Sequence, residues 1–194
     1  MRPDDAQVNR RLLELLVERS FAERDVVLAS GKRSNFYVDC RETALHPEGA
    51  YLIGRAMLAR LAEGDEVRAV AGVTVGGDPL VTAVAVVGHL EGRPLPAMIV
   101  RKEQKGHGVG GFLVGAGRVE PGTPVALLED VVTTGGSVIR ALERLEQAGY
   151  PVRRVLALVD REEGGAENLR EAGHTLEALY RRRDFPLGAG EGTS

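Results

Sequence analysis

Residues 129–137, Glu-Asp-Val-Val-Thr-Thr-Gly-Gly-Ser, have the types and spacing of an anion-binding turn. They continue the apolar run Val-Ala-Leu-Leu and precede a stretch of helical periodicity, which predicts a strand, a turn and a helix. Gly135 and Gly136 let the backbone approach a ligand, and a helix N-terminus favours a phosphate. We expect Ser137 to cap the helix. The segment is not a Walker P-loop, because the Gly-Lys-Ser/Thr ending is missing.

Two acidic residues, Glu129 and Asp130, stand directly before this turn. A ribose 5-phosphate reconciles the acids with the anion site, because its hydroxyls would donate hydrogen bonds to the carboxylates while its phosphate occupies the turn. Carboxylates near the ring could also stabilise positive charge that develops at the anomeric carbon. An ordinary turn with a serine cap would explain Ser137 and one glycine, but not the two threonines, the second glycine and the acids.

A second segment, 101–111, gathers four potential cations, Arg101, Lys102, Lys105 and His107, in a chain of net charge -3. A loop of this kind that closes over pyrophosphate would neutralise a leaving group and exclude water. The alternative is a solvated surface loop with a chance cluster of charge. Its glycines match G-x-G-x-x-G, but charged residues separate them from the preceding strand and no helical periodicity follows. We therefore exclude a dinucleotide site.

The composition of the chain limits the class of protein. With 194 residues, 43% hydrophobic and 27% charged, it predicts one soluble globular domain over 1–194. The negative net charge argues against a general nucleic-acid or membrane-surface binder. Apolar runs are too short to span a bilayer, and the N-terminus does not resemble a signal peptide. The one cysteine, Cys40, excludes an intrachain disulfide, and no Cys or His cluster suggests zinc. We expect a cytoplasmic protein.

The rest of the sequence predicts the frame that positions these segments. Strands are predicted at 67–73, 96–100, 125–130 and 152–160, helices at 6–21, 47–61, 78–90 and 136–149, and a hairpin from 26–29 and 36–40. Apolar strands that alternate with helices predict an α/β fold with a mostly parallel sheet covered on both faces. Ligands bind at the carboxyl ends of such strands. The tail, about 187–194, lacks apolar content and is expected to be disordered.

Several of these segments resemble one known family. The strand with Glu-Asp and Thr-Thr-Gly-Gly-Ser resembles the phosphoribosyl pyrophosphate (PRPP) motif of type I phosphoribosyltransferases. The Arg-Lys-x-x-Lys-x-His pattern is similar to the catalytic loop of orotate phosphoribosyltransferases. "LASGKRSNFYVDCR" is similar to the orotate-binding segment of that family, and "ALVDREEGG" resembles its later base-binding segment. The resemblance runs from about 6 to 173 in the family's order of motifs.

The resemblance implies a fold, a reaction and an assembly. The fold is the type I phosphoribosyltransferase fold, with about 1–45 as a small N-terminal hood. The reaction transfers the 5-phosphoribosyl group from PRPP to orotate and gives orotidine 5′-monophosphate and pyrophosphate in pyrimidine (UMP) biosynthesis. Mg²⁺, a hard cation, would be bound mainly through PRPP. The assembly is a homodimer whose 101–111 loop acts in the partner's active site. No decarboxylase domain follows, so we expect a monofunctional enzyme without nucleic-acid or membrane partners.

Residues that match the family's motifs take the implied roles. The catalytic residues would be Lys105, His107, Asp130 and Arg101. The residues that bind PRPP would be Arg101, Lys102, Lys105, His107, Glu129, Asp130, Val131, Val132, Thr133, Thr134, Gly135, Gly136 and Ser137. The residues that bind orotate would be Lys32, Phe36, Tyr37, Thr133 and Arg161.

One turn departs from the pattern of some family members, which carry a lysine where this chain has Gly76. Pyrophosphate binding at this turn must then rest on backbone N–H groups, on Thr74 and on the basic loop. We expect Asp78 to cap the helix that follows rather than to act in catalysis.

Two alternatives remain. A phosphoribosyltransferase for another base, such as a purine, would share the PRPP motif, but an uncharged purine gives no reason for the two cations Lys32 and Arg161. A non-catalytic, PRPP-sensing regulator of transcription would keep the same motif but would not need the basic loop. It would also require an added DNA-binding element, which this sequence does not suggest.

Overall fold

The computed structural model describes residues 4–27, 33–64, 66–104 and 109–186. The helices are α1 (Asp5–Arg19), α2 (Arg41–Ala44), α3 (Pro47–Ala62), α4 (Gly77–Leu90), α5 (Gly136–Gln147) and α6 (Gly165–Glu171). The strands are β1 (Phe21–Val27), β2 (Arg33–Val38), β3 (Ala69–Val73), β4 (Ala97–Val100), β5 (Leu113–Val114), β6 (Val125–Val132), β7 (Val152–Asp160) and β8 (Leu176–Arg181). Short 3-10 turns cover Val109–Phe112, Ala116–Arg118 and Arg182–Asp184. The expected tail, 187–194, lies outside the described residues.

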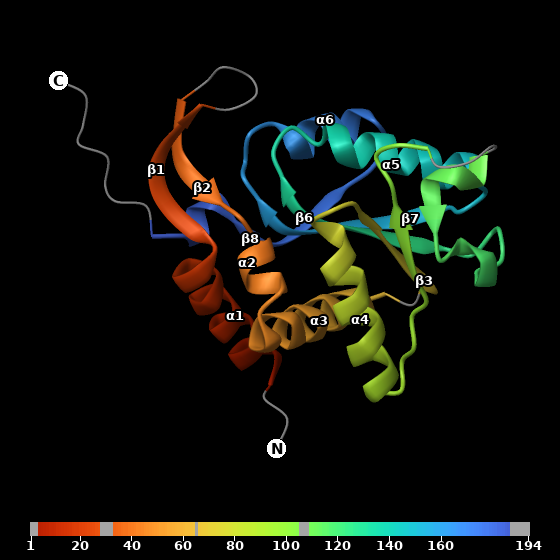
Figure 1. Ribbon diagram of the computed structural model, residues 1–194, viewed down its shortest axis with the longest axis horizontal. Coiled ribbons are helices and arrows are strands. Elements are labelled where there is room, and N and C mark those ends of the chain that lie inside the picture. Colours follow the sequence, from red (N-terminus) through yellow and green to blue (C-terminus); the bar gives the residue numbers. More distant parts are fainter. Residues whose placement is uncertain (1–3, 28–32, 65, 105–108, 187–194) are drawn as a thin grey trace.

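Six strands form one sheet in the order β5-β4-β3-β6-β7-β8, and β1 and β2 form a separate antiparallel hairpin. The pairs from β4 to β8 are parallel, whereas β5 runs antiparallel to β4. Figure 1 shows α1, α3 and α4 on one side of the sheet and α5 and α6 on the other. The predicted α/β architecture is therefore confirmed.

The central strand β6 shows why both faces of the sheet are covered. Its residues Ala126 and Leu128 pack into a buried cluster with side chains of α1, α3 and α4. The alternate residues Val125 and Leu127 belong to a second cluster with side chains of α5 and α6. Successive strand residues point to opposite faces, so a strand between two helical layers must be apolar throughout.

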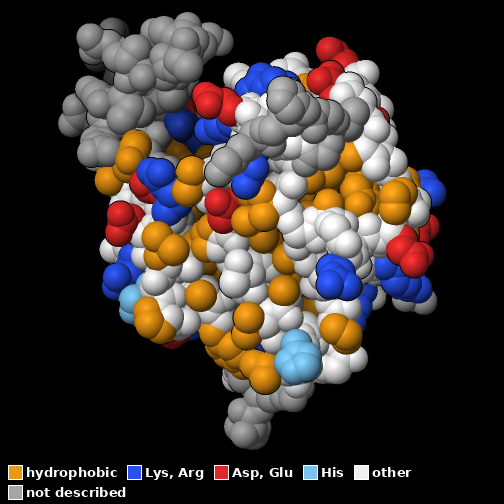
Figure 2. All heavy atoms as spheres, turned by 45° about the vertical axis from the view of Figure 1, so that its right-hand side comes forward, with side chains coloured by type: hydrophobic (Ala, Val, Ile, Leu, Met, Phe, Trp, Pro, Cys, Tyr) orange, Lys and Arg blue, Asp and Glu red, His pale blue; other side chains and the backbone are white. Residues whose placement is uncertain are grey.

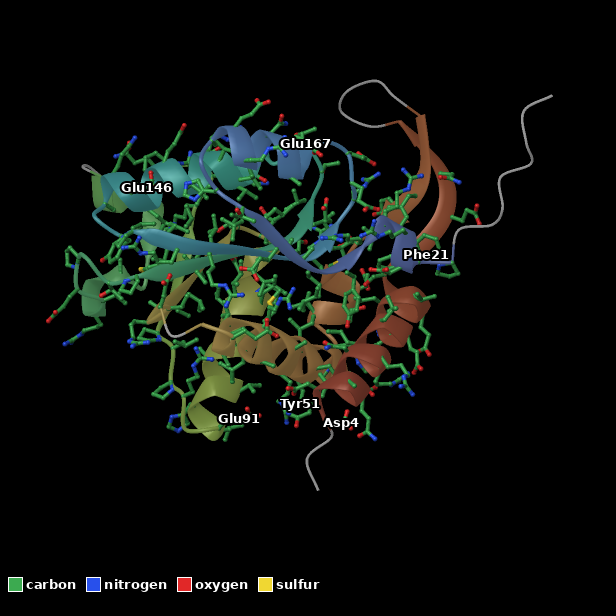
Figure 3. The ribbon with its side chains drawn as sticks, turned by 180° about the vertical axis from the view of Figure 1, so that it is seen from behind. Asp4, Phe21, Tyr51, Glu91, Glu146 and Glu167 are labelled. Carbon is green, nitrogen blue, oxygen red and sulfur yellow. The ribbon has the colours of Figure 1, made fainter. Side chains whose placement is uncertain are left out.

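The hairpin joins the body of the protein through three aromatic rings. The ring centroids of Phe21 and Phe36 lie 5.4 Å apart, and that of Phe185 lies 5.3 Å from Phe36. Phe21 starts β1, Phe36 lies in β2, and Phe185 follows the last 3-10 turn. Figure 3 shows Phe21 where the hairpin meets this C-terminal segment. The segment expected to form the hood thus rests on the end of the described chain. The division into one domain, 1–194, stays a prediction.

The boundaries differ from the sequence prediction at several points. The first helix ends at Arg19 rather than at 21, because Phe21 pairs with Val38 in the hairpin. Residues 33–35 belong to β2 rather than to a turn. Four elements, α2, β5, α6 and β8, were not predicted from the sequence. Among the described helices, none has the length and hydropathy that a membrane span requires.

Candidate active site

The carboxyl ends of β3 and β6 open into a cavity of about 410 Å³ beneath the hairpin. Its lining residues are Tyr37, Val38, Asp39, Arg41, Val73, Thr74, Val75, Gly76, Lys102, Glu129, Asp130, Val131 and Ser137. Besides Thr74 of the turn after β3, six of these are predicted site residues: Tyr37, Lys102, Glu129, Asp130, Val131 and Ser137. They come from β2, from the segment after β4, from β6 and from α5, so the fold brings together residues from distant parts of the chain.

The turn after β6 has the backbone of an anion site. Gly135 has a φ of 78°, in the left-handed region that glycine adopts without strain, and Gly136 begins α5. The Asn168 Nδ2 group of α6 donates to the Thr134 carbonyl oxygen over 2.9 Å, which holds the turn from outside. The first N–H groups of a helix have no acceptor within it, so the start of α5 can offer donors to a phosphate.

The expected capping role of Ser137 is wrong. Gly135 occupies the N-cap position of α5, and no side chain makes the cap hydrogen bond. The Ser137 hydroxyl instead donates to Glu129 Oε2 over 3.2 Å. It turns away from the helix N-terminus because a buried carboxylate of the preceding strand needs a donor.

The two acids have different environments. Glu129 is only 5% exposed and accepts hydrogen bonds from Ser137 Oγ and the Asp130 N–H. Burial, and then the charge of Asp130, raise the pKa of Glu129 well above its ordinary value. Asp130 is half-buried, lines the cavity, and accepts the Val131 N–H over 2.8 Å through Oδ1. Asp130 is thus the better exposed of the two carboxylates.

The turn after β3 forms the opposite wall of the cavity, through Thr74, Val75 and Gly76. A Cβ atom on Gly76 would overlap the carboxylate of Asp130, so with this Asp130 orientation the two walls leave no room for one. The expected cap at Asp78 is wrong, because Gly76 occupies the N-cap position of α4 and no side chain caps it. The Asp78 carboxylate accepts from Thr74 Oγ1 over 3.3 Å instead, and burial raises its pKa.

The basic segment is described in part. Lys102 is exposed and lines the cavity, whereas Arg101 is half-buried and its N–H donates to the Phe112 carbonyl oxygen over 2.8 Å. Lys105 and His107 lie outside the described residues. The described residues of this segment thus reach the cavity through Lys102.

Two of the predicted base-binding residues, Arg161 and Phe36, meet at the hairpin. Arg161, at the end of β7, donates through Nη2 to the Phe36 carbonyl oxygen over 3.0 Å and lies 5.5 Å from the centroid of the Phe36 ring. The same nitrogen is 2.8 Å from Glu163 Oε1. The Phe36 ring has no exposed surface, whereas Tyr37 lines the cavity. Lys32 lies outside the described residues.

The remaining predicted residues lie along the turn. The Val132 side chain is buried in the core, so only its backbone is available to a ligand, and its carbonyl oxygen accepts the Arg161 N–H over 2.9 Å. Thr133 is half-buried and Thr134 is exposed. The backbone at Thr133 packs closely on Gly165 of α6. A Cβ atom added to Gly165 would lie only 2.7 Å from the Thr133 carbonyl oxygen. Helix α6, which the sequence analysis missed, therefore supports the turn.

Asp39 and Arg41, which were not predicted as site residues, line the same cavity. Arg41 Nε and Nη2 donate to the two Asp39 carboxylate oxygens over 2.7 and 2.6 Å. These bonds hold the pKa of Asp39 below its ordinary value. The only local signal is the Asp-x-Arg spacing in the hairpin sequence, which by itself is common to many surface ion pairs.

A mostly parallel sheet between helical layers, with an acid pair in the cleft at its carboxyl edge and a glycine turn directly after that pair, is the arrangement of the type I phosphoribosyltransferase class. The sequence matches no family model. An orotate phosphoribosyltransferase of Sorangium cellulosum (strain So ce56) is 51% identical over 180 residues, 93% of this chain and 94% of that protein. This chain belongs to the orotate phosphoribosyltransferase family.

Solved structures agree with this relationship. The orotate phosphoribosyltransferase of Mycobacterium tuberculosis H37Rv in complex with Fe(III) dicitrate is 35% identical with a TM-score of 0.80, over 93% of this chain and 99% of that one. The same enzyme in complex with PRPP is 33% identical with a TM-score of 0.76, over the same shares of the two chains. The type I phosphoribosyltransferase fold predicted from the sequence is confirmed.

Proposed function

We propose that this chain transfers the 5-phosphoribosyl group from PRPP to orotate, giving orotidine 5′-monophosphate and pyrophosphate in pyrimidine (UMP) biosynthesis. The observation that carries the proposal is that Ser137 at the start of α5, Asp130 of β6 and Tyr37 of the hairpin line one cavity, while Arg161 donates to the same hairpin at Phe36. Its relatives carry the name of this activity, and one solved relative binds PRPP.

PRPP would lie along the end of β6. Its 5-phosphate would accept hydrogen bonds from the backbone N–H groups of 134–137, and its ribose hydroxyls would donate to Asp130 and Glu129. Its pyrophosphate would then point to the turn after β3, at Thr74, and to the basic segment. Arg101, Lys102, Lys105 and His107 would neutralise it there. In this orientation each charged end of PRPP faces hydrogen-bond donors or cationic side chains.

Orotate would lie beneath the hairpin. It is an anionic pyrimidine, so its carboxylate needs cations, which Lys32 and Arg161 would supply, while Thr133 and Tyr37 would border the ring. Phe36 would act through Arg161, because its ring is fully buried and its carbonyl oxygen receives the guanidinium. The aromatic residue thus orders the cation that binds the base.

The reaction would break the bond between the anomeric carbon and pyrophosphate as the orotate nitrogen approaches. Asp130 would stabilise the positive charge that develops on the ribose ring, and the basic segment would stabilise the negative charge on the leaving group. No protein nucleophile is needed. Lys105, His107 and Arg101 would be catalytic residues that assist the departure of the pyrophosphate.

A divalent cation fits this site. The described residues include no group of three or more His, Cys, Asp or Glu side chains that could hold a metal alone. Asp130 and Glu129 nevertheless offer oxygen ligands in the cavity, and oxygen is what Mg²⁺ prefers. Mg²⁺ bound mainly through PRPP would help to neutralise the departing pyrophosphate.

The enzyme would act as a cytoplasmic homodimer, without nucleic-acid or membrane partners, in which the loop 101–111 serves the partner's site. A groove of about 590 Å³, mainly apolar, runs along α2 and α4 beside the cavity, and Arg41 and Val75 line both. Leu45, at its edge, is 75% exposed, and Val86 is 54% exposed. Figure 2 shows hydrophobic side chains on this side of the molecule. A second copy that covers this surface would lie next to the mouth of the cleft.

A panel of bases tests the proposed activity. With PRPP and Mg²⁺, we expect the purified protein to consume orotate, followed by ultraviolet absorbance, and to leave adenine, hypoxanthine and uracil unchanged. A chelator should stop the reaction and added Mg²⁺ should restore it. Turnover of another base in the absence of orotate turnover would overturn the assignment.

A further inference from the structure

Arg144 of α5 contacts both described ends of the basic segment. Its Nη1 and Nη2 groups donate to the carbonyl oxygens of Arg101 and Lys102 over 2.5 and 2.9 Å. Its guanidinium also lies 4.2 Å from the centroid of the Phe112 ring, at the far end of the same segment. The Arg101 N–H donates to the Phe112 carbonyl oxygen over 2.8 Å. One side chain thus fixes the backbone where the segment leaves the sheet and where it returns.

The same helix carries the anion turn. Arg144 lies eight residues after Gly136, so the two are separated by about 12 Å along the helix axis, at about 1.5 Å per residue. Val138, Leu142 and Leu145 of α5 are buried in the core and prevent the helix from turning or sliding. Helix α5 therefore sets the distance between the phosphate end of the site and the start of the basic segment.

We propose that Arg144 is a positioning residue for the transferase reaction. It holds the backbone of Arg101 and Lys102 in register with the N-terminus of α5, so that the Lys102 side chain, which lines the cavity of the same subunit, meets the pyrophosphate of a PRPP whose 5-phosphate lies on that N-terminus. This inference rests on the proposed function. A guanidinium suits the role because its planar fork binds two carbonyl oxygens at once while its face stacks on a ring.

Arg93 provides a matched control. Its Nη1 and Nη2 groups donate to the carbonyl oxygens of Leu58 and Leu61 over 3.3 and 2.8 Å, at the end of α3. It does not line the cavity. Arg93→Met and Arg144→Met therefore each remove an arginine that binds two backbone carbonyls, but only Arg144→Met releases the basic segment.

Steady-state kinetics of the two variants test the inference, at a temperature where both are folded by circular dichroism. Arg144→Met should lower kcat/KM for PRPP by about ten-fold or more, since small misplacements of positioned groups have effects of this size or larger. Its KM for orotate should change by less than about two-fold. Arg144→Lys, which retains the charge, should recover only part of the loss. Arg93→Met should lower Tm and leave kcat/KM for PRPP unchanged.

Equal kinetic losses in the Arg93 and Arg144 variants, or unchanged PRPP kinetics in Arg144→Met, would overturn the positioning role. Failure of the wild-type protein to use orotate would instead overturn the proposed function. In that case calorimetric titration with pyrophosphate and Mg²⁺ still tests Arg144. Weaker binding by Arg144→Met than by Arg93→Met supports the inference, and equal binding contradicts it.

Discussion

The adjacent acids Glu129 and Asp130 differ because of the strand that carries them. Successive residues of β6 point in opposite directions, so Glu129 turns to Ser137 of α5 while Asp130 turns to the Val131 N–H, and both line the cavity. Burial makes the charged form of Glu129 costly. A ribose hydroxyl would add a donor to this carboxylate that Ser137 alone does not supply. Glu129 is therefore a place where ligand binding would relieve an electrostatic cost.

A pH series on Glu129→Gln tests this cost. The pKa of Glu129 is higher in the folded protein than in the unfolded chain, so its contribution to stability is fully present below the unfolded pKa and is lost as pH rises through the folded pKa. Without ligand, the variant should gain Tm relative to wild type as pH rises above about 4.3, the ordinary glutamate pKa. The control is Glu171→Gln, at an exposed position of α6. Parallel Tm curves for Glu129→Gln and wild type from pH 4 to 9 would show that ionisation of Glu129 does not destabilise the folded protein.

The constraint at Gly76 comes from the Asp130 side chain rather than from backbone conformation. Its φ of -64° suits any residue, but an added Cβ would overlap the Asp130 carboxylate. Gly76→Ala should force Asp130 away from the Val131 N–H and lower kcat by about ten-fold or more, as expected when a group that stabilises transition-state charge is displaced. Gly117→Ala, where a Cβ meets nothing within 4 Å, is the control and should keep full turnover. Wild-type kcat in Gly76→Ala would contradict the idea that an added Cβ displaces Asp130 from a productive position.

At the scale of elements, the strands and helices beside the site could be predicted because their signals are local. Apolar runs marked β3, β6 and β7, and Gly149, with a φ of 85°, lies just beyond α5 as a helix-ending glycine does. The two cap assignments failed for one reason. Ser137 and Asp78 each follow a glycine that takes the N-cap position, and both side chains pair with a residue of the preceding strand or turn. A local pattern does not reveal such a partner.

The missed elements lack a local signal of their own. Strand β8 is half-buried over Leu176–Leu179 and mixes charged with apolar residues, so no alternation or apolar run marks it. Helix α6 has only seven residues and β5 only two. The contacts of Arg161 with Phe36 and of Arg144 with Arg101 join residues 125 and 43 positions apart. Only the folded chain reveals these pairs, which is why the sequence predicts base-binding residues without their geometry.

The aromatic cluster under the hairpin should connect stability with orotate binding. Phe185 is 4% exposed and packs edge-on against Phe36, the residue whose carbonyl receives Arg161. Phe185→Ala should destabilise the protein by about 3–5 kcal/mol. It should also raise KM for orotate more than KM for PRPP, because Arg161 loses a fixed acceptor.

Tyr150→Ala separates the two effects of the Phe185 substitution. Tyr150 is equally buried, at 4% exposed, and its hydroxyl donates to the Val119 carbonyl oxygen over 2.8 Å, away from the hairpin. Urea unfolding and the two KM values should therefore show lost stability in both variants and weaker orotate binding in Phe185→Ala alone. If the ratio of KM for orotate to KM for PRPP is the same in both variants, the aromatic cluster does not contribute to orotate binding.

At the scale of the whole molecule, the site and the apolar groove meet at Arg41 and Val75. A symmetric dimer on this surface would bring two clefts close to one boundary, where a loop from one subunit can reach the other. Stability and catalysis would then depend on the same contact. The assembly can be tested without knowing the position of the loop.

Mixed dimers decide whether the active sites are shared between subunits. Lys105→Ala and Arg161→Ala homodimers should each have little activity. In a heterodimer of the two, one site would combine an intact Arg161 with the partner's intact loop, while the other site would carry both lesions. Purified through two different tags, this heterodimer should recover about half of the wild-type turnover, because a symmetric dimer has two equivalent sites. If each loop served its own subunit, every site would keep one lesion and no activity would return.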